Sequence, residues 1–186
     1  YQIEDEPARL QLEDPAAPLP LDVLHRRLAA HGFRIEPLPF NEVTNLWARR
    51  GDKAPLFCFA GHTDVVPPGP REHWDSDPFE PEIRNGLLYG RGACDMKGGL
   101  AASIVAAEAF AAIVPDYRGA IEISGTADEE SGGFGGVAWL AEQGYFSPER
   151  VQHVIQRLDA VPPVVLGPSW EVVGAHQRVG LDRLGI

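Results

Sequence analysis

The stretch Leu56-Phe57-Cys58-Phe59-Ala60-Gly61-His62-Thr63-Asp64 decides how the chain is organised. Its first five residues form a short continuous apolar run, which is typical of a strand buried on both faces in a parallel sheet. The residues that follow open a loop that carries a histidine and a carboxylate. Ligands of open α/β sheets bind just beyond the carboxyl ends of strands, so this junction is a candidate site.

Helix and strand patterns alternate on both sides of this stretch. An apolar helical stripe begins at Leu21 and ends at Gly32, and the alanine-rich segment 96–112 is the strongest helix candidate. The alternation predicts an α/β fold whose sheet is mostly parallel and flanked by helices. The remaining candidates are strands at 33–37, 44–48, 119–126 and 151–155, a strand or turn at 87–92, and a helix at 136–144, while prolines keep the region up to Glu82 irregular.

Composition and charge narrow the classes of partner. The formal net charge of −11 argues against nucleic acid or an anionic membrane as partner, because both attract basic patches. No uninterrupted apolar run is long enough to span a membrane. Two cysteines, Cys58 and Cys94, are too few for a disulfide framework, and we expect both to be free thiols. With no secretory leader visible, these features predict a cytoplasmic protein.

His62 and Asp64 form the first group of candidate site residues. They are two residues apart, so on an extended segment their side chains share a face. A histidine that binds a metal usually donates its second ring N–H to a carboxylate, and Asp64 is placed for that role. The alternative is a surface pair without a function.

Two further segments carry carboxylates near the ends of predicted elements. Asp95 lies in a glycine-dense loop just before the long helix, where it could instead be an ordinary N-terminal cap. Asp128, Glu129 and Glu130 are three consecutive acids after a strand, and such groups repel one another unless a cation or solvent separates them. One glutamate could bind a metal while the other accepts a proton from the attacking water; the alternative is a solvated acidic turn.

Taken together, a histidine and several carboxylates from three distant segments suit Zn²⁺, with Co²⁺ or Mn²⁺ as possible substitutes. In these segments the chain resembles the M20 family of metallopeptidases and deacylases, most closely its succinyl-diaminopimelate desuccinylase and acetylornithine deacetylase branch. The resemblance runs from about residue 43 to residue 155. It is carried by the motifs Gly61–Pro67, Trp74 with Asp77–Pro81, Leu88–Gly98 and Asp128–Glu130.

The resemblance implies a centre with two zinc ions on an α/β catalytic domain. It makes His62 a zinc ligand with Asp64 as its supporting acid, Asp95 a bridge between both metals, Glu130 a ligand of the second zinc and Glu129 the general acid/base. The implied reaction is attack of a metal-held hydroxide on the amide carbonyl of a small N-acyl amino acid, with Glu129 passing the proton to the leaving amine. It also implies a cis peptide bond after Asp95.

The chain departs from the family pattern after residue 155. The family places a further carboxylate ligand in a Glu-Pro motif where this chain reads Asp159-Ala160, and the context of the only late histidine, His176, does not match. The family's dimerisation domain has no counterpart here. We therefore expect a loosely ordered acidic, proline-rich arm (1–20), a partial catalytic domain (21–155) and a tail unlike the family that can be disordered (156–186), as in a truncated or frame-shifted product. The alternative function is an inactive fragment that folds partially and binds metal weakly or not at all.

Overall fold

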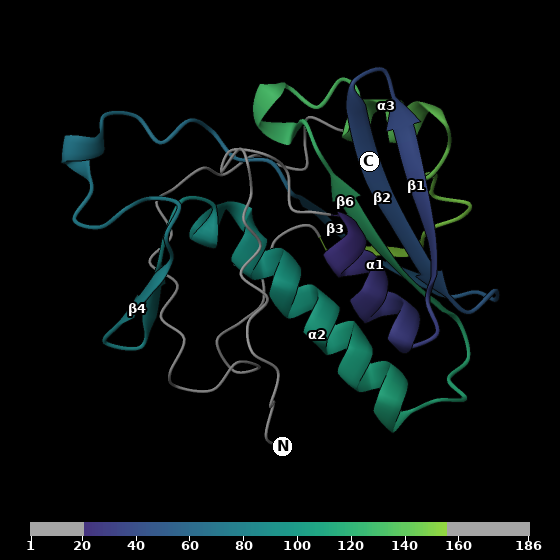
Figure 1. Cartoon of the computed structure of the whole chain (residues 1–186). Helices are drawn as coiled ribbons and strands as arrows, with labels where there is room; N and C mark the ends of the chain where they lie inside the picture. Colours follow the sequence, from purple (N-terminus) through teal and green to yellow (C-terminus); the bar gives the residue numbers. More distant parts are fainter. Residues whose placement is uncertain (1–20, 156–186) are drawn as a thin grey trace.

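The computed structural model describes residues 21–155, so the arm 1–20 and the tail 156–186 expected from the sequence lie outside the described residues (Figure 1). A five-stranded sheet forms the centre of the molecule, in the order β1-β2-β6-β3-β7. The strands are β1 (Arg34–Phe40), β2 (Val43–Arg50), β3 (Leu56–His62), β6 (Ala120–Thr126) and β7 (His153–Ile155).

The sheet is mixed. Strand β3 pairs in parallel with both β6 and β7, whereas β2 pairs antiparallel with both β1 and β6. Strand β2 therefore runs against the other four, because a turn of only two residues joins it to β1, and so short a connection permits only an antiparallel pair. Asn41 in this turn has a φ of 53°, which asparagine tolerates. The α/β prediction is confirmed, with this one reversed strand inside the sheet.

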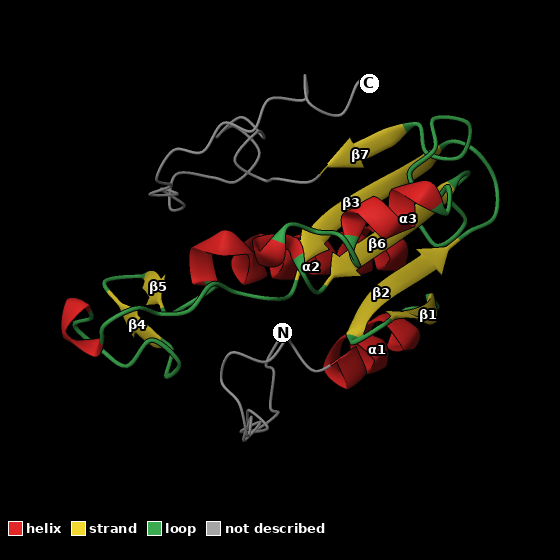
Figure 2. Ribbon diagram, turned by 90° about the horizontal axis from the view of Figure 1, so that it is seen from above, coloured by secondary structure: helices red, strands yellow, loops and turns green. Residues whose placement is uncertain are grey.

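Helices cover both faces of the sheet (Figures 1 and 2). Helices α1 (Leu21–Ala30) and α2 (Gly98–Ile113) pack on one face, and α3 (Val137–Glu142) packs on the other. Each face has its own apolar cluster. The cluster under α1 and α2 contains Leu24, Leu28, Phe33, Leu46, Ala48, Leu100, Ile104, Ala107, Ala111, Ile121 and Ile123. The cluster under α3 contains Leu38, Trp47, Leu56, Cys58, Ala120, Leu140 and Val151.

Helix α2 packs on the sheet through a stripe of residues three and four positions apart. Leu100, Ile104, Ala107 and Ala111 are all buried, which is the spacing of one face of an α-helix. Full burial of a leucine or isoleucine side chain contributes roughly 1.5–3 kcal/mol, so this stripe stabilises the contact between α2 and the sheet.

By length and composition alone, Ala93–Ile113 is the one helical segment of the described chain that could cross a membrane. The core helix of a folded domain passes the same test. The regular part, Gly98–Ile113, has 16 residues and spans about 24 Å at 1.5 Å per residue, which is shorter than a hydrocarbon core of about 30 Å. This helix is therefore weak support for a membrane partner.

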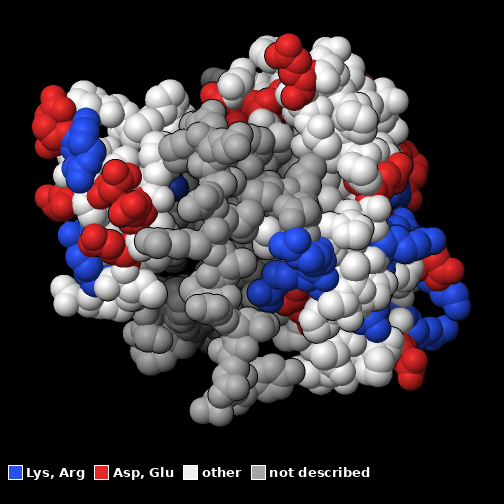
Figure 3. Space-filling model, in the orientation of Figure 1, with Lys and Arg blue, Asp and Glu red and all other residues white. Residues whose placement is uncertain are grey.

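The segment between β3 and α2 forms a lobe that projects from the sheet (Figure 2). It contains the single-turn helix η1 (Arg71–His73) and a hairpin of β4 (Glu82–Arg84) and β5 (Leu87–Tyr89). The indole N–H of Trp74 donates to the carbonyl of Pro68 at 2.9 Å, and the Arg91 guanidinium lies 5.1 Å from the centre of the Trp74 ring. Figure 3 shows acidic and basic side chains mixed on this lobe.

A buried ion pair lies under α3, near the beginning of β6. Glu122 is fully buried, and its Oε1 accepts hydrogen bonds from Arg49 at 2.9 Å and from Arg150 at 2.8 Å. The Arg150 guanidinium also lies over the rings of Trp47 and Tyr145. A pocket of about 260 Å³ opens beside these arginines, at the opposite end of the sheet from His62.

Candidate metal centre

His62 is the last residue of β3 and is 3% exposed. The next residue, Thr63, fixes the chain as it leaves the sheet: its backbone N–H and its hydroxyl both donate to the carbonyl of Thr126, at 2.7 and 3.0 Å. The Nδ1 atom of His62 lies 3.1 Å from the backbone oxygen of Asp64 and 3.4 Å from its carboxylate. Both contacts are made through Nδ1, so Nε2 is left to face the other acids.

Asp95 lies in the turn η2 (Ala93–Lys97), which connects the projecting lobe to α2. Asp95 and Met96 are not helical, and the peptide bond between them is cis, as the resemblance implies. Gly92 before the turn has a φ of 81°, and a Cβ there would lie 2.5 Å from Val65, so this position requires glycine. The position that caps α2 is Lys97, without a side-chain cap bond, so Asp95 is not an ordinary N-terminal cap.

The acidic segment after β6 forms the short helix η3 (Glu129–Ser131). Asp64 holds the tip of this segment, because its carboxylate accepts the backbone N–H groups of Glu129 at 3.3 Å and Glu130 at 3.1 Å. Asp64 therefore contacts two of the predicted site segments at once, the imidazole of His62 and the acidic turn.

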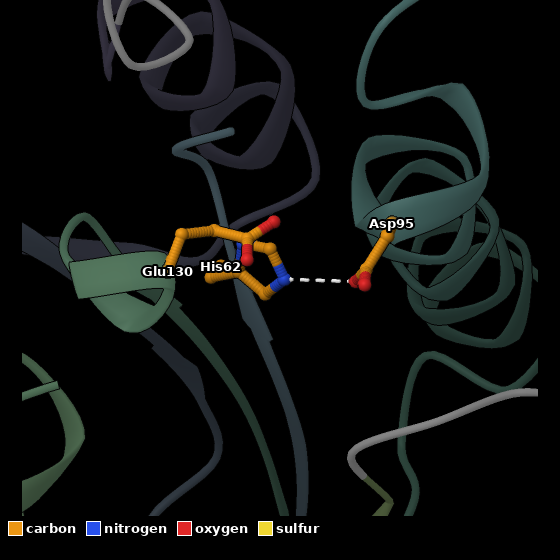
Figure 4. Close-up of side chains that lie close together, drawn as sticks. All are labelled: His62, Asp95 and Glu130. Atoms are coloured by element: carbon orange, nitrogen blue, oxygen red, sulfur yellow. Dashed lines mark hydrogen bonds and ion pairs between the residues drawn. The ribbon is translucent and has the colours of Figure 1, made fainter. Parts of the chain in front are cut away.

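Ligand atoms of His62, Asp95 and Glu130 lie within 4.8 Å of one another. Figure 4 shows Asp95 and Glu130 approaching the imidazole from opposite sides, with Nε2 of His62 at 3.1 Å from Oδ1 of Asp95. Glu129 is also close, with Oε2 at 3.7 Å from the same nitrogen. The structure thus brings together all five residues singled out in the sequence, at the carboxyl ends of the parallel strands β3 and β6.

The site carries a surplus of negative charge. Burial opposes protonation of His62, but hydrogen bonds to Asp64 and Asp95 and the charge of Glu129 outweigh it and raise its pKa to about 9. Burial and the charge of Asp95 raise the pKa of Glu130, against the opposite effect of His62. Within residues 21–155, the ion pairs of Asp95 and Glu129 are with His62 and with no lysine or arginine.

This donor set fits a divalent cation. One imidazole nitrogen and several carboxylate oxygens are the ligands that zinc takes in catalytic sites, and a cation would relieve the repulsion among the acids. His62, Asp95 and Glu130 are the residues that would hold it. Thr63 is a supporting residue that the sequence interpretation did not single out; its only signal was its position between two candidate residues.

Comparison with known proteins identifies the family. Residues 58–175 match the sequence pattern described as Peptidase family M20/M25/M40, which extends 20 residues beyond residue 155. The succinyl-diaminopimelate desuccinylase of Acinetobacter baumannii (strain AYE) is 52% identical over 136 residues, which are 70% of this chain and 36% of that protein. The desuccinylase of Nitrosococcus oceani is 50% identical over 133 residues, 72% of this chain and 35% of that protein. The chain thus spans about a third of the length of these relatives.

Solved structures show the same fold. Human carnosine dipeptidase 1 superposes with a TM-score of 0.62 at 26% identity, over 76% of this chain and 34% of that one. An M20 family metallo-carboxypeptidase from Sulfolobus solfataricus superposes with a TM-score of 0.63 at 21% identity, over 73% of this chain and 31% of that one, and this likeness concerns the fold alone. The matched sequence pattern covers more than half of the chain, and the chain therefore belongs to peptidase family M20/M25/M40.

Proposed function

We propose that this chain carries one side of the metal centre of a zinc-dependent hydrolase that cleaves the amide bond of a small N-acyl amino acid. The observation that carries the proposal is the convergence of His62, Asp95 and Glu130 within 4.8 Å, with Glu129 beside them. The desuccinylase relatives, at about half identity, favour a succinyl amide as substrate and a place in amino-acid biosynthesis in the cytoplasm. Nucleic acid and membrane are not part of this proposal.

The proposed roles follow from the contacts of each residue. His62, Asp95 and Glu130 would hold the metal, which would polarise the substrate carbonyl and lower the pKa of water. Two zinc ions, with Asp95 between them, are the arrangement that the family resemblance implies, and Co²⁺ or Mn²⁺ could replace zinc. Asp64 keeps the imidazole and the acidic turn in place.

Glu129 is the proposed general acid/base. Its side chain is 41% exposed, so it can reach both solvent and a bound substrate, while its backbone is held by Asp64. Glu129 takes the proton from the attacking water and delivers it to the leaving amine. A carboxylate suits both steps, because it can accept a proton and then return it.

The test combines metal analysis and turnover on the same sample. The purified chain is loaded with Zn²⁺ or Co²⁺, passed through gel filtration, and assayed with N-succinyl and N-acetyl amino acids. We expect bound metal and preference for the succinyl substrate. We expect Glu129→Gln to lower kcat by about 10²- to 10⁴-fold while metal content stays the same. Glu142→Gln, at an exposed glutamate of α3, is the matched control and should change neither. Equal rates for wild type and Glu129→Gln would remove Glu129 from the proposed role.

The second candidate function is a non-catalytic fragment. It is favoured by one observation, that the ligand atoms gathered within residues 21–155 come from three residues, His62, Asp95 and Glu130. Catalytic zinc sites normally keep three protein ligands per ion, so a two-metal centre requires ligands beyond His62, Asp95 and Glu130. A chain that binds no metal after gel filtration, or binds it without turnover, would support this second function.

A further inference from the structure

Asn45, near the start of β2, is a fully buried amide whose side chain reaches the acidic loop. Its Nδ2 donates to the backbone oxygen of Gly135 at 2.9 Å and, more weakly, to that of Leu38 at 3.4 Å. Its Oδ1 accepts the backbone N–H of Ala127 at 3.3 Å. One side chain therefore uses both its donor and its acceptor on three separate backbone segments.

Two of the three backbone partners of Asn45 lie at the two ends of one loop. Ala127 directly follows β6, and Gly135 lies just before α3, so they are the two ends of the loop 127–135 that carries Glu129 and Glu130. Asn45 ties both ends of this loop to β2. A second bond closes the same base, because Oδ2 of Asp128 accepts the backbone N–H of Gly135 at 2.6 Å.

The base of the loop is also packed tightly against the β1–β2 hairpin. A Cβ added at Gly135 would lie 3.2 Å from Val43 and 3.3 Å from Phe40, and a Cβ added at Gly136 would collide with the carboxylate of Asp128. Little free space therefore surrounds the backbone that Asn45 holds. If the amide is removed, buried backbone groups lose their partners, and the loop must move to satisfy them.

We propose that Asn45 is a positioning residue for the metal centre. Asn45 holds the two ends of the loop 127–135, at Ala127 and Gly135. Asp64 holds the middle of the loop, and the two side chains together orient Glu129 and Glu130 toward His62. The amide supplies a donor for Gly135 and an acceptor for Ala127 on two separate atoms of one side chain. The effect of Asn45 on metal binding rests on the proposed function. The attachment of the loop to β2 does not depend on that function.

The test uses the full chain and two readouts. Asn45→Asp keeps the volume and the acceptor but loses the donors to Gly135 and Leu38. We expect its backbone amides at 129–135 to exchange hydrogen faster than in wild type, without metal. We also expect its Kd for Co²⁺ to be roughly 10- to 100-fold weaker, the usual effect of losing a residue that supports metal ligands. Leu46→Val is the control, because Leu46 is the next residue of β2, is buried, and packs on the opposite face of the sheet.

Each outcome decides the proposal. Faster exchange at 129–135 and weaker Co²⁺ binding in Asn45→Asp, but not in Leu46→Val, would support it. Unchanged exchange, or faster exchange with unchanged Co²⁺ affinity, would overturn it. If wild type itself binds no Co²⁺, the proposed metal site fails, and the exchange comparison alone decides whether Asn45 holds the loop. Should Asn45→Asp fail to fold, Asn45→Ser is measured in the same way.

Discussion

Strand β6 has acidic side chains at both of its ends, and the two ends treat them differently. Near the beginning, Glu122 is fully buried and bonded to two arginines, Arg49 and Arg150. Just beyond the other end, Glu129 and Glu130 join Asp95 around His62. Within residues 21–155, no arginine or lysine forms an ion pair with these three acids.

The difference lies in how each group of carboxylates is neutralised. At the beginning of β6 the protein supplies its own cations, so the carboxylate is neutralised within the fold. At the end of β6, no arginine or lysine of residues 21–155 forms an ion pair with Asp95, Glu129 or Glu130, and the nearby Lys97 interacts instead with Asp64. Repulsion among the three acids therefore remains, relieved within the described residues mainly by the imidazole of His62. Carboxylates that a fold crowds together without arginine or lysine partners are candidates for metal binding, whereas a buried carboxylate paired with arginines, such as Glu122, is not.

The largest expected effect breaks the paired end. Replacing both Arg49 and Arg150 by methionine leaves Glu122 buried without a cation, and its Oε2 already has no hydrogen-bond partner. We expect the free energy of unfolding to fall by about 3–5 kcal/mol, the usual effect of breaking a buried pair. Urea denaturation at pH 8 measures the loss. Arg34→Met, an exposed arginine at the same end of the sheet, is the control. A loss no greater than that of the control would show that Glu122 does not need its partners.

An intermediate effect is expected at the metal end. Asp64→Asn keeps the size of the side chain but places an amide where the carboxylate accepts two backbone N–H groups from the acidic turn. We expect the Kd for Co²⁺, measured by calorimetric titration, to rise roughly 10- to 100-fold. Asp116→Asn, at an exposed aspartate after α2, serves as control. An unchanged Kd for Asp64→Asn would show that Asp64 does not support metal binding.

The smallest expected effect is a change in stability that has opposite signs at the two ends of β6. Without metal, Glu130→Gln removes one of the crowded negative charges, so we expect a gain in unfolding free energy of less than about 1 kcal/mol. Glu122→Gln, at the paired end, should instead destabilise the chain, because it removes the partner of two arginines. Thermal unfolding in EDTA compares the two variants. If both lowered the melting temperature, the acids around His62 would not be under repulsion.

The sequence predicted the helices and strands whose buried apolar residues recur at a regular spacing. It missed those that bury no such pattern. The stripe of α2 is buried, since its apolar spacing matches the surface that it covers. In the run Leu56–Ala60, Leu56 and Cys58 are buried and the other three residues are half-buried. The hairpin β4–β5 was not predicted as such: Ile83 is 77% exposed and Leu88 is 54% exposed, so burial imposes no pattern there. The reversed direction of β2 depends on a two-residue turn at Asn41, which gives only a weak signal.

The residues of the candidate site that carry ligand groups could be predicted from the sequence, whereas the residues that hold them in place could not. His62, Asp64, Asp95, Glu129 and Glu130 stood out because rare combinations of ligand residues follow predicted strands or precede a helix. Asn45 gave no signal, because a single asparagine within a strand pattern says nothing about which loop it will contact 90 residues later. Glu122 was equally hidden: it alternates with Ile121 and Ile123 like a solvent-facing residue. That face becomes an interior through α3 and the segment that follows it, which contributes Tyr145, Phe146 and Val151.

The parallel pairing of β3 with β6 joins Leu56 to Ala120, residues 64 positions apart in the chain. Contacts so distant in sequence form late, since the entropy of closing the intervening loop must first be overcome. His62 ends β3 and Glu130 follows β6, so we expect His62, Asp95 and Glu130 to come together only after that pairing forms. A metal ion therefore has no assembled site to bind in the early stages of folding. We expect zinc to lower the unfolding rate of the folded domain and to leave its folding rate unchanged. The ion would then stabilise the finished fold without directing its formation.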